Sequence, residues 1–203
     1  MAVPAEPSAR TPWRDGHFIG GHPILDLANT VFDRAHPVPG NELLETSSDV
    51  LTWCQSVGLF DSAPTLRGSV ADGLAAEVRA VREHAWATFD AVARGTAVPA
   101  GALGALLERS GTGLRAGRVH DVDADLRHVA ADWAAPGAIP AALSLLAVHA
   151  LFTLPAERVR ACARCGWLFL DSSRGGRRRW CSMSTCGNRE KASRHRRTTR
   201  SAG

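Results

Sequence analysis

Four cysteines near the C-terminal end have the type and spacing of a metal site. Cys162 and Cys165 are separated by two residues, and after fifteen further residues Cys181 and Cys186 form a second, wider pair. Thiolates are strong ligands for Zn²⁺, and two converging pairs supply the four sulfurs of a closed tetrahedral site. Gly166, directly after the first pair, permits the tight backbone turn that this spacing needs. We therefore expect one structural Zn²⁺ bound by these four cysteines.

Two other uses of clustered cysteines stay open from the sequence, namely buried or redox-active thiols and an iron–sulfur cluster. A redox motif needs one Cys-x-x-Cys pair and not two converging pairs, which favours zinc. The fifth cysteine, Cys54, lies alone on the apolar face of an expected helix, so core packing is predicted for it. Four thiolates leave no open metal position for water, and no Ser-His-Asp, HExxH or phosphate-loop pattern is present. The sequence therefore does not predict an enzyme.

Charge is distributed unevenly along the 203 residues. Residues 1–155 contain 11 arginines against 17 acidic residues, a formal charge of −6, whereas residues 156–203 contain 12 arginines and one lysine against three acidic residues, a formal charge of +10. An acidic body with a basic tail points to a polyanionic partner. The candidate nucleic-acid-binding residues are Arg174, Arg177, Arg178, Arg179, Arg189, Lys191, Arg194, Arg196 and Arg197.

Guanidinium groups suit phosphate oxygens and guanine edges, and a metal scaffold would hold them in fixed positions. We therefore expect a nucleic-acid partner, with DNA favoured over RNA. The alternatives are an RNA- or ribosome-associated finger that uses the same charges, and a protein-interaction scaffold whose basic tail is solvated or lies against its own acidic body.

The tail predicts a small finger in which a hairpin separates the two cysteine pairs. Residues 167–170 have the composition of a strand, residues 172–176 that of a turn, and residues 177–180 would form the returning strand. Residues 188–197 are compatible with a basic helix, which completes a knuckle–hairpin–knuckle–helix order of the treble-clef or ribbon-like kind. A unit of 48 residues, 156–203, buries too little apolar surface to fold alone, so zinc would supply folding energy.

The rest of the chain predicts a multihelical body, so the expected fold class is mainly α. Apolar residues at helical spacing predict helices from about Pro23, from Ser47 or Ser48 to Gly58, over about 70–93, from Pro99 to the Gly111/Gly113 pair, and over 141–154. Residues 114–135 permit a short strand or hairpin before another helical piece. Residues 1–16, rich in Pro, Ala, Ser and Arg, are expected to be disordered, residues 17–155 to form the body and residues 156–203 the finger.

Three polar residues interrupt the apolar run near the N-terminus and share one helical face: Asp26, Asn29 and Thr30. They could line a small-molecule pocket, in which case an effector would act through the body. The interpretation that we favour is structural, with these side chains capping the helix and satisfying the Gly20-Gly21 turn. Because a single finger contacts few base pairs, a homodimer formed through the body also fits the sequence.

No segment has the pattern of a targeting or membrane-spanning sequence. The N-terminus lacks the apolar region of a signal peptide. The longest apolar stretch, 138–154, is interrupted by Pro140, Ser144 and His149 and is shorter than the roughly 20 residues that a bilayer requires. We expect no membrane partner and a soluble cytoplasmic protein, in which thiols stay reduced.

Two motifs carry a resemblance to known families. Cys186-Gly187-Asn188-Arg189, with RRRWC at 177–181 and FLD at 169–171, resembles the CGNR zinc-finger family. GGHPILDLANT at 20–30 resembles the helical ABATE domain usually fused to this finger, although LDLANT stands here where that family more often has an LDFVNT-like string. The resemblance implies a bacterial, stress-induced transcription regulator with a DNA-binding zinc finger.

Overall fold

The computed structural model describes residues 13–123 and 129–201, without the side chains of residues 194, 195 and 197–201. The body contains α1 (Pro23–Ala28), α2 (Ser47–Ser56), α3 (Gly68–Arg94), α4 (Ala100–Arg115), β1 (Val119–Val122), β2 (Val129–Ala131) and α5 (Ala138–Thr153), preceded by a 3₁₀ turn, η1 (Asp15–His17). The finger contains η2 (Ala156–Arg158), β3 (Val159–Ala161), β4 (Leu168–Leu170), a π-helical turn η3 (Met183–Gly187) and α6 (Asn188–Ser201). The mainly α fold class, with a small four-cysteine finger at the C-terminal end, is confirmed.

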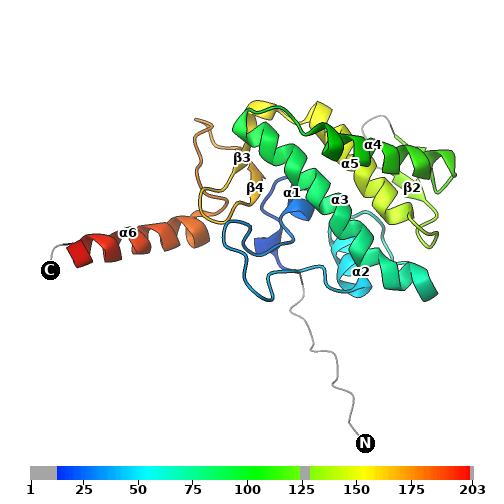
Figure 1. Ribbon diagram of the computed structural model, residues 1–203, viewed down its shortest axis with the longest axis horizontal. Helices are drawn as coiled ribbons and strands as arrows, with labels where there is room; N and C mark the ends of the chain where they lie inside the picture. Colours follow the sequence, from blue (N-terminus) through cyan, green and yellow to red (C-terminus); the bar gives the residue numbers. More distant parts are fainter. Residues whose placement is uncertain (1–12, 124–128, 202–203) are drawn as a thin grey trace, which may run out of the picture.

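Helix α3 is the central element of the body and runs diagonally across it, in contact with α1, α2, α4 and α5 (Figure 1). Its apolar residues recur at helical spacing and are buried, which is why the predicted stripe forms the core. Helix α5 packs beside α3 and α4, and its first turns are buried on all sides. Cys54 on α2 lies in this core, as predicted, and burial raises the pKa of its thiol.

The α4–α5 contact corrects the predicted end of α4. The helix does not stop at Gly111 or Gly113 but continues to Arg115. Gly113 is buried against Ala141 of α5, and a Cβ atom at this position would collide with the side chain of Ala141. The glycine is therefore a helix-packing residue that lets two helices approach closely, and tertiary contact outweighs its low helix propensity.

Two helix starts also differ slightly from expectation. The N-cap of α2 is Thr46, one residue before Ser47, and its side chain forms a capping box with Asp49. Pro99 precedes α4 as its N-cap residue and is not the first helical residue. The predicted start of α1 at Pro23 and the end of α5 before Pro155 are both observed.

The hairpins also differ in part from the prediction. β1 and β2 pair antiparallel within the ambiguous 114–135 region, of which residues 124–128 lie outside the described part. In the finger, β4 pairs with the preceding β3 and not with residues 177–180. The predicted hairpin between the cysteine pairs is therefore wrong: the first pair lies in the loop of a β3–β4 hairpin. Residues 177–180 are irregular in the structure, with one backbone bond from the Ala163 N–H to the Arg179 carbonyl (3.1 Å).

The finger lies at one end of the body, where β3 and β4 contact the helices, and α6 extends outward from it (Figure 1). The expected disordered N-terminus covered residues 1–16, of which 1–12 lie outside the described part. Trp13 is half-buried, and its indole N–H donates to the Asp49 carbonyl (3.3 Å). In the part of the chain that the structure describes, no helix has both the length and the apolar character needed to cross a membrane.

Candidate metal centre and its attachment to the body

The four cysteine sulfurs converge on one point. They all lie within 4.8 Å of one another, all four residues are buried, and none forms a disulfide. The three sulfur–sulfur distances among Cys165, Cys181 and Cys186 are each 3.6 Å. A tetrahedron with Zn–S bonds of about 2.3 Å has edges of about 3.8 Å. The spacing of this donor set therefore fits a single tetrahedral zinc ion and is too wide for disulfide bonds.

Two tight turns position the sulfurs. In the β3–β4 loop the Cys162 N–H donates to the Trp167 carbonyl (2.7 Å), and the Gly166 N–H donates back to the Cys162 carbonyl (3.0 Å). Gly166 has φ +74°, and a Cβ atom there would lie 3.2 Å from the side chain of Arg34. Glycine suits this position for two reasons: it adopts the left-handed conformation without strain, and it has no Cβ atom to collide with the body. In the second pair, Cys181 precedes the π-helical turn η3 and Cys186 lies within it, and this turn leads directly into α6.

Four ionised thiolates at this spacing would need a cation between them. Hydrogen bonds from Cys165 and Cys181 lower the pKa of the Cys162 thiol, and their interactions with Cys162 raise the pKa values of those two thiols. Converging thiolates repel one another, so four can be ionised together only around a positive ion. One structural Zn²⁺ is the cofactor that fits, and it would join the two cysteine turns without offering an open coordination position.

Arg178 braces the second cysteine turn. Its guanidinium donates from Nε to the Trp180 carbonyl (3.0 Å) and from Nη2 to the Cys181 carbonyl, and lies 4.6 Å from the centre of the Phe169 ring. Its backbone N–H donates to the Asp171 carboxylate (2.8 Å). Sequence reasoning grouped Arg178 with the nucleic-acid contacts, but the structure shows that its guanidinium bonds to the finger itself.

Asp171 anchors the loop between the two cysteine pairs. Its carboxylate also accepts from the Ser173 N–H (2.9 Å), and the bonds from Ser173 and Arg178 lower its pKa to about 2. Arg158 donates to the Ser173 carbonyl (3.0 Å) and Arg160 to the Gly176 carbonyl (3.2 Å), so both side chains bind the same loop.

The outer edge of β4 is covered by residues from the N-terminal segment. Along β4, the backbone N–H and carbonyl of Phe169 point toward β3, whereas those of Leu168 and Leu170 point away from it. The side-chain amide of Asn29 pairs with both backbone groups of Leu168, with its oxygen accepting from the N–H and its nitrogen donating to the carbonyl, each at 2.8 Å. The Leu170 N–H donates to the Gly20 carbonyl (2.8 Å). Asn29 and Gly20 thus act as a substitute strand along an otherwise unpaired edge.

Two further contacts fasten the cysteine loop to the body. The Trp167 indole N–H donates to the Val31 carbonyl (2.7 Å). The backbone N–H of Arg34 donates to the Cys165 carbonyl (2.9 Å), while the Arg34 side chain binds the Ala28 carbonyl and Glu83 of α3. The finger is therefore held to the body through its zinc-binding loop as well as through β4.

The other two candidate pocket residues are also engaged within the body. Asp26 accepts from the Gly20 N–H (2.7 Å), and burial raises the pKa of its carboxyl to about 6. The Thr30 hydroxyl donates to the Leu27 carbonyl (2.7 Å). Asp26, Asn29 and Thr30 therefore form bonds that position the Gly20 turn, α1 and β4. A cavity of about 860 Å³ lies elsewhere in the body and is lined by other residues.

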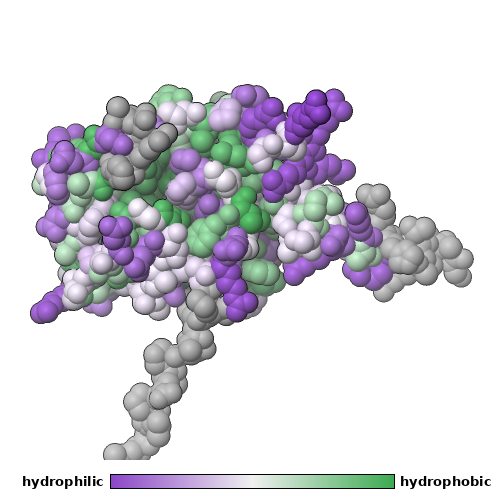
Figure 2. Space-filling view, turned by 180° about the vertical axis from the view of Figure 1, so that it is seen from behind, coloured by the Kyte–Doolittle hydropathy of each residue, from purple (hydrophilic) through white to green (hydrophobic). Residues whose placement is uncertain are grey.

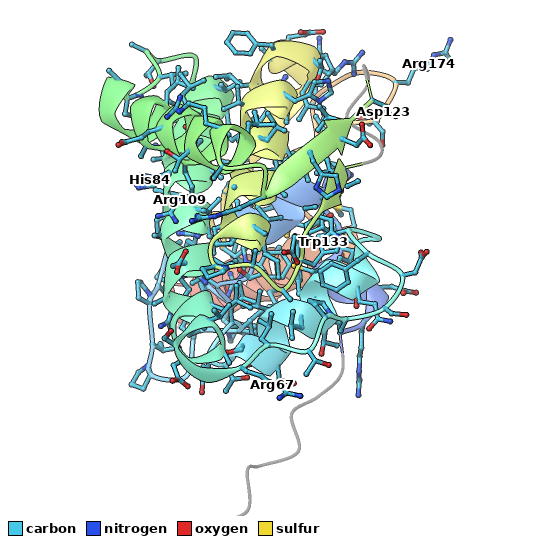
Figure 3. All side chains as sticks on the ribbon, turned by 90° about the vertical axis from the view of Figure 1, so that its right-hand side faces the viewer. Arg67, His84, Arg109, Asp123, Trp133 and Arg174 are labelled. Atoms are coloured by element: carbon cyan, nitrogen blue, oxygen red, sulfur yellow. The ribbon has the colours of Figure 1, made fainter. Side chains whose placement is uncertain are left out.

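The remaining basic candidates lie on two exposed segments of the finger. Arg174, Arg177 and Arg179 are exposed on the 171–180 loop, where Figure 3 shows Arg174 pointing outward. Exposed candidates on α6 are Arg189, Lys191 and Arg196. The side chains of Arg194 and Arg197 lie outside the described part, although their backbone belongs to α6. The structure thus places these candidates on the loop between the two cysteine pairs and on the helix that follows the second pair.

Sequence reasoning missed the anchoring residues Arg34 and Trp167, and it also missed a pair of histidines. His22 and His149 line the same cavity although 127 positions separate them. His22 belongs to the GGHPILDLANT string, but nothing in that string indicates His149 as its neighbour, so only the packing of α1 against α5 could identify the pair.

Comparison with known families agrees with this division of the chain. Residues 158–198 match the model of the CGNR zinc finger. Residues 21–157 match the ABATE model, described as "Putative stress-induced transcription regulator". No match to a curated protein was found. Since the ABATE match alone spans more than half of the chain, this protein belongs to the ABATE family, and it carries a CGNR zinc finger at its C-terminal end.

Proposed function

We propose that this protein is a zinc-dependent transcription regulator that binds duplex DNA through its finger. The observation that carries the proposal is the position of α6: this basic helix begins at Asn188, two residues after the last zinc-binding cysteine, and stands clear of the body (Figure 1). Its 14 residues give a length of about 21 Å at 1.5 Å per residue. A free-standing helix of this size fits the major groove, which admits an α-helix.

The exposed loop supports the same proposal. Arg174, Arg177 and Arg179 are exposed on the 171–180 loop of the finger, and among the described side chains none of them forms an ion pair with a carboxylate. Such residues can bind phosphates on either side of a groove-bound helix, which fixes its register. Arg178 is left out of this surface because its guanidinium braces the cysteine turn.

The remaining parts of the proposal concern the body. Residues 17–155 would act as a sensor or dimerisation domain and residues 156–203 as the DNA-binding unit. A homodimer would present two fingers, which suits two half-sites on DNA. The reduced thiols that the zinc site needs fit the cytoplasm.

The test is fluorescence anisotropy of the zinc-loaded full chain with a duplex DNA and a structured RNA over a range of salt concentrations. If five to eight phosphates are neutralised, the logarithm of the DNA affinity should fall with log salt at a slope of about −5 to −7. Replacing both Arg177 and Arg179 by alanine should weaken binding and flatten the slope by about 1.8. The matched control replaces Arg67 and Arg115, two exposed arginines of the body, and removes the same charge.

Equal losses in the two double variants would show that net charge and not the finger surface governs binding. Tighter binding to the RNA at every salt concentration would replace DNA by RNA as the partner. No binding to either nucleic acid at about 0.15 M salt would favour a protein-interaction scaffold.

A further inference from the structure

The body has a cavity, partly open to solvent, that the zinc site and the basic surface do not use. It has a volume of about 860 Å³ and lies between α1, the loop after α2, β2 and α5. Figure 2, which views the molecule from behind, shows hydrophobic residues exposed among hydrophilic ones on the surface of the body. Protein interiors are normally close-packed, and cavities of about 300–1,000 Å³ are typical of small-molecule sites. The size alone therefore marks this cavity as a candidate site.

The cavity wall is mainly aromatic and aliphatic. Trp133, which follows β2, and Phe60, which follows α2, meet edge to face with their ring centres 5.5 Å apart. Figure 3 shows Trp133 projecting toward the α2 side of the body. Leu143 and Leu146 of α5 also line the cavity. Such a wall suits a flat apolar ligand, because aromatic rings stack or meet edge to face.

One polar group of the cavity is fixed in its protonation state. His22 is the N-cap of α1, and its Nδ1 accepts a hydrogen bond from the Ile24 N–H (3.2 Å). Burial and the neighbouring His149 lower the pKa of His22 to about 4, so its ring is neutral at pH 7. Since Nδ1 accepts, the single ring proton must be on Nε2. His22 therefore contributes a neutral N–H donor to a site that Asp61, Ser62 and His149 also line beside its apolar residues.

We propose that this cavity binds a small, flat, largely apolar molecule that carries an oxygen acceptor, such as a carbonyl or carboxylate group. The ring of the ligand packs against Trp133 and Leu146, and its oxygen accepts a hydrogen bond from His22. The cavity borders α1, and Asn29, the residue directly after this helix, holds β4 of the finger. The inference gives a location and a ligand class to the sensor role proposed above. Its test involves no nucleic acid, so the two can fail separately.

The test uses two probes with the zinc-loaded full chain: naphthalene, which is a hydrocarbon, and 1-naphthoate, which adds a carboxylate. Both should bind saturably at one site and shift the NMR signal of the Trp133 indole N–H. For ligands of this size we expect dissociation constants of roughly 10 μM to 1 mM. Leu146→Trp fills the cavity and should weaken both probes by at least about tenfold.

His22→Asn separates the polar contact from the apolar one. Asparagine is a good N-cap and can still accept from the Ile24 N–H, but its shorter side chain has no N–H donor at the position of the ring Nε2. Binding of 1-naphthoate should weaken by about fivefold or more, whereas that of naphthalene should change by less than about twofold.

Two further variants keep the test decisive. Leu107→Trp adds the same indole on an exposed face of α4, outside the cavity, and should leave binding unchanged. If Leu146→Trp lowers the zinc content or helicity, Ala130→Phe takes its place, because Ala130 lines the cavity from an exposed position on β2. Absence of saturable binding, or undiminished binding to the filled variants, would overturn the site. Equal losses of both probes in His22→Asn would overturn the acceptor role.

Discussion

Replacement of Asn29 by alanine tests whether the finger and the body fold as one unit. Asn29 is 1% exposed, and its amide bonds to both backbone groups of Leu168 at 2.8 Å. Alanine would remove both partners and leave a buried N–H and a buried carbonyl of β4 unpaired. The hydrophobic residues of β3 and β4, Val159 and Leu168, belong to the same core cluster as the helices. Any loosening of β4 should therefore destabilise the whole chain.

The expected loss follows from these two bonds. A buried polar group left without its partner costs about 1–3 kcal/mol, so two such groups give roughly 2–6 kcal/mol. This is a large part of the 5–15 kcal/mol by which domains are usually stable. Asn29→Asp should be at least as harmful at neutral pH. One carboxylate oxygen can still accept from the Leu168 N–H, but the other would face the Leu168 carbonyl and repel it.

The assay is urea unfolding of the zinc-loaded protein, followed both by circular dichroism at 222 nm and by zinc release to a chromogenic chelator. Both signals should change in a single transition that moves to lower urea concentration in Asn29→Ala. The control is Gln55→Ala, which removes an exposed amide with one bond, to the Asp61 carbonyl (2.9 Å). We expect this control to lose less than about 0.5 kcal/mol.

Two results would refute the reasoning. A loss below about 1 kcal/mol in Asn29→Ala would mean that the edge of β4 finds other partners, such as water. Separate transitions for helix content and zinc release in the parent protein would mean that the finger unfolds independently of the body.

Three further predictions concern the buried carboxyl, the metal and the arginine brace. Because burial raises the pKa of Asp26 from 3.8 to about 6, the native state binds this proton more tightly than the unfolded chain, and its contribution to stability grows as pH falls through 6. The free energy of unfolding of Asp26→Asn should therefore exceed that of the parent at pH 7.5 by on the order of 1–3 kcal/mol, and this difference should shrink toward pH 5. A difference that stays constant with pH would contradict the raised pKa of Asp26. Removal of zinc with a strong chelator, or the substitution Cys162→Ser, should lower the unfolding midpoint of the helices as well as that of the finger. Calorimetry measures this midpoint, and an unchanged value for the helices would show that the zinc site does not stabilise the body. Arg178→Ala should release zinc on the order of tenfold faster in a chelator assay, because the carbonyls of Trp180 and Cys181 lose a charged donor. Arg177→Ala should release zinc at the rate of the parent protein. Equal rates in the two variants would show that Arg178 does not stabilise the cysteine turn.

Much of the finger could be predicted from the sequence because its information is local. Each cysteine pair lies within one short turn, so spacing alone indicates that the sulfurs can converge, and the structure brings all four within 4.8 Å. The five longest helices of the body were also predictable in approximate position, since a buried helix face requires apolar residues at a repeating interval, but the further helical piece expected within 114–135 is not found among the described residues. Composition likewise separated the acidic body from the basic tail.

Contacts between distant parts of the chain could not be predicted from the sequence pattern. The run Trp167–Leu170 was recognised as a strand, but its partner was misassigned because strand composition does not encode which neighbour supplies the hydrogen bonds. Gly113 looked like a helix end until the packing of α5 showed why a side chain is excluded there.

The sequence by itself determined the metal, its four ligands and the helical character of the body, because these depend on residues within a few turns of one another. Only the tertiary structure decided what the polar residues do. Asn29 meets β4 across 139 positions, Arg178 turns inward onto its own finger, and His22 meets His149 in a cavity. A polar side chain is compatible with either a binding or a structural role, and only the groups that the folded chain places against it determine which role it has.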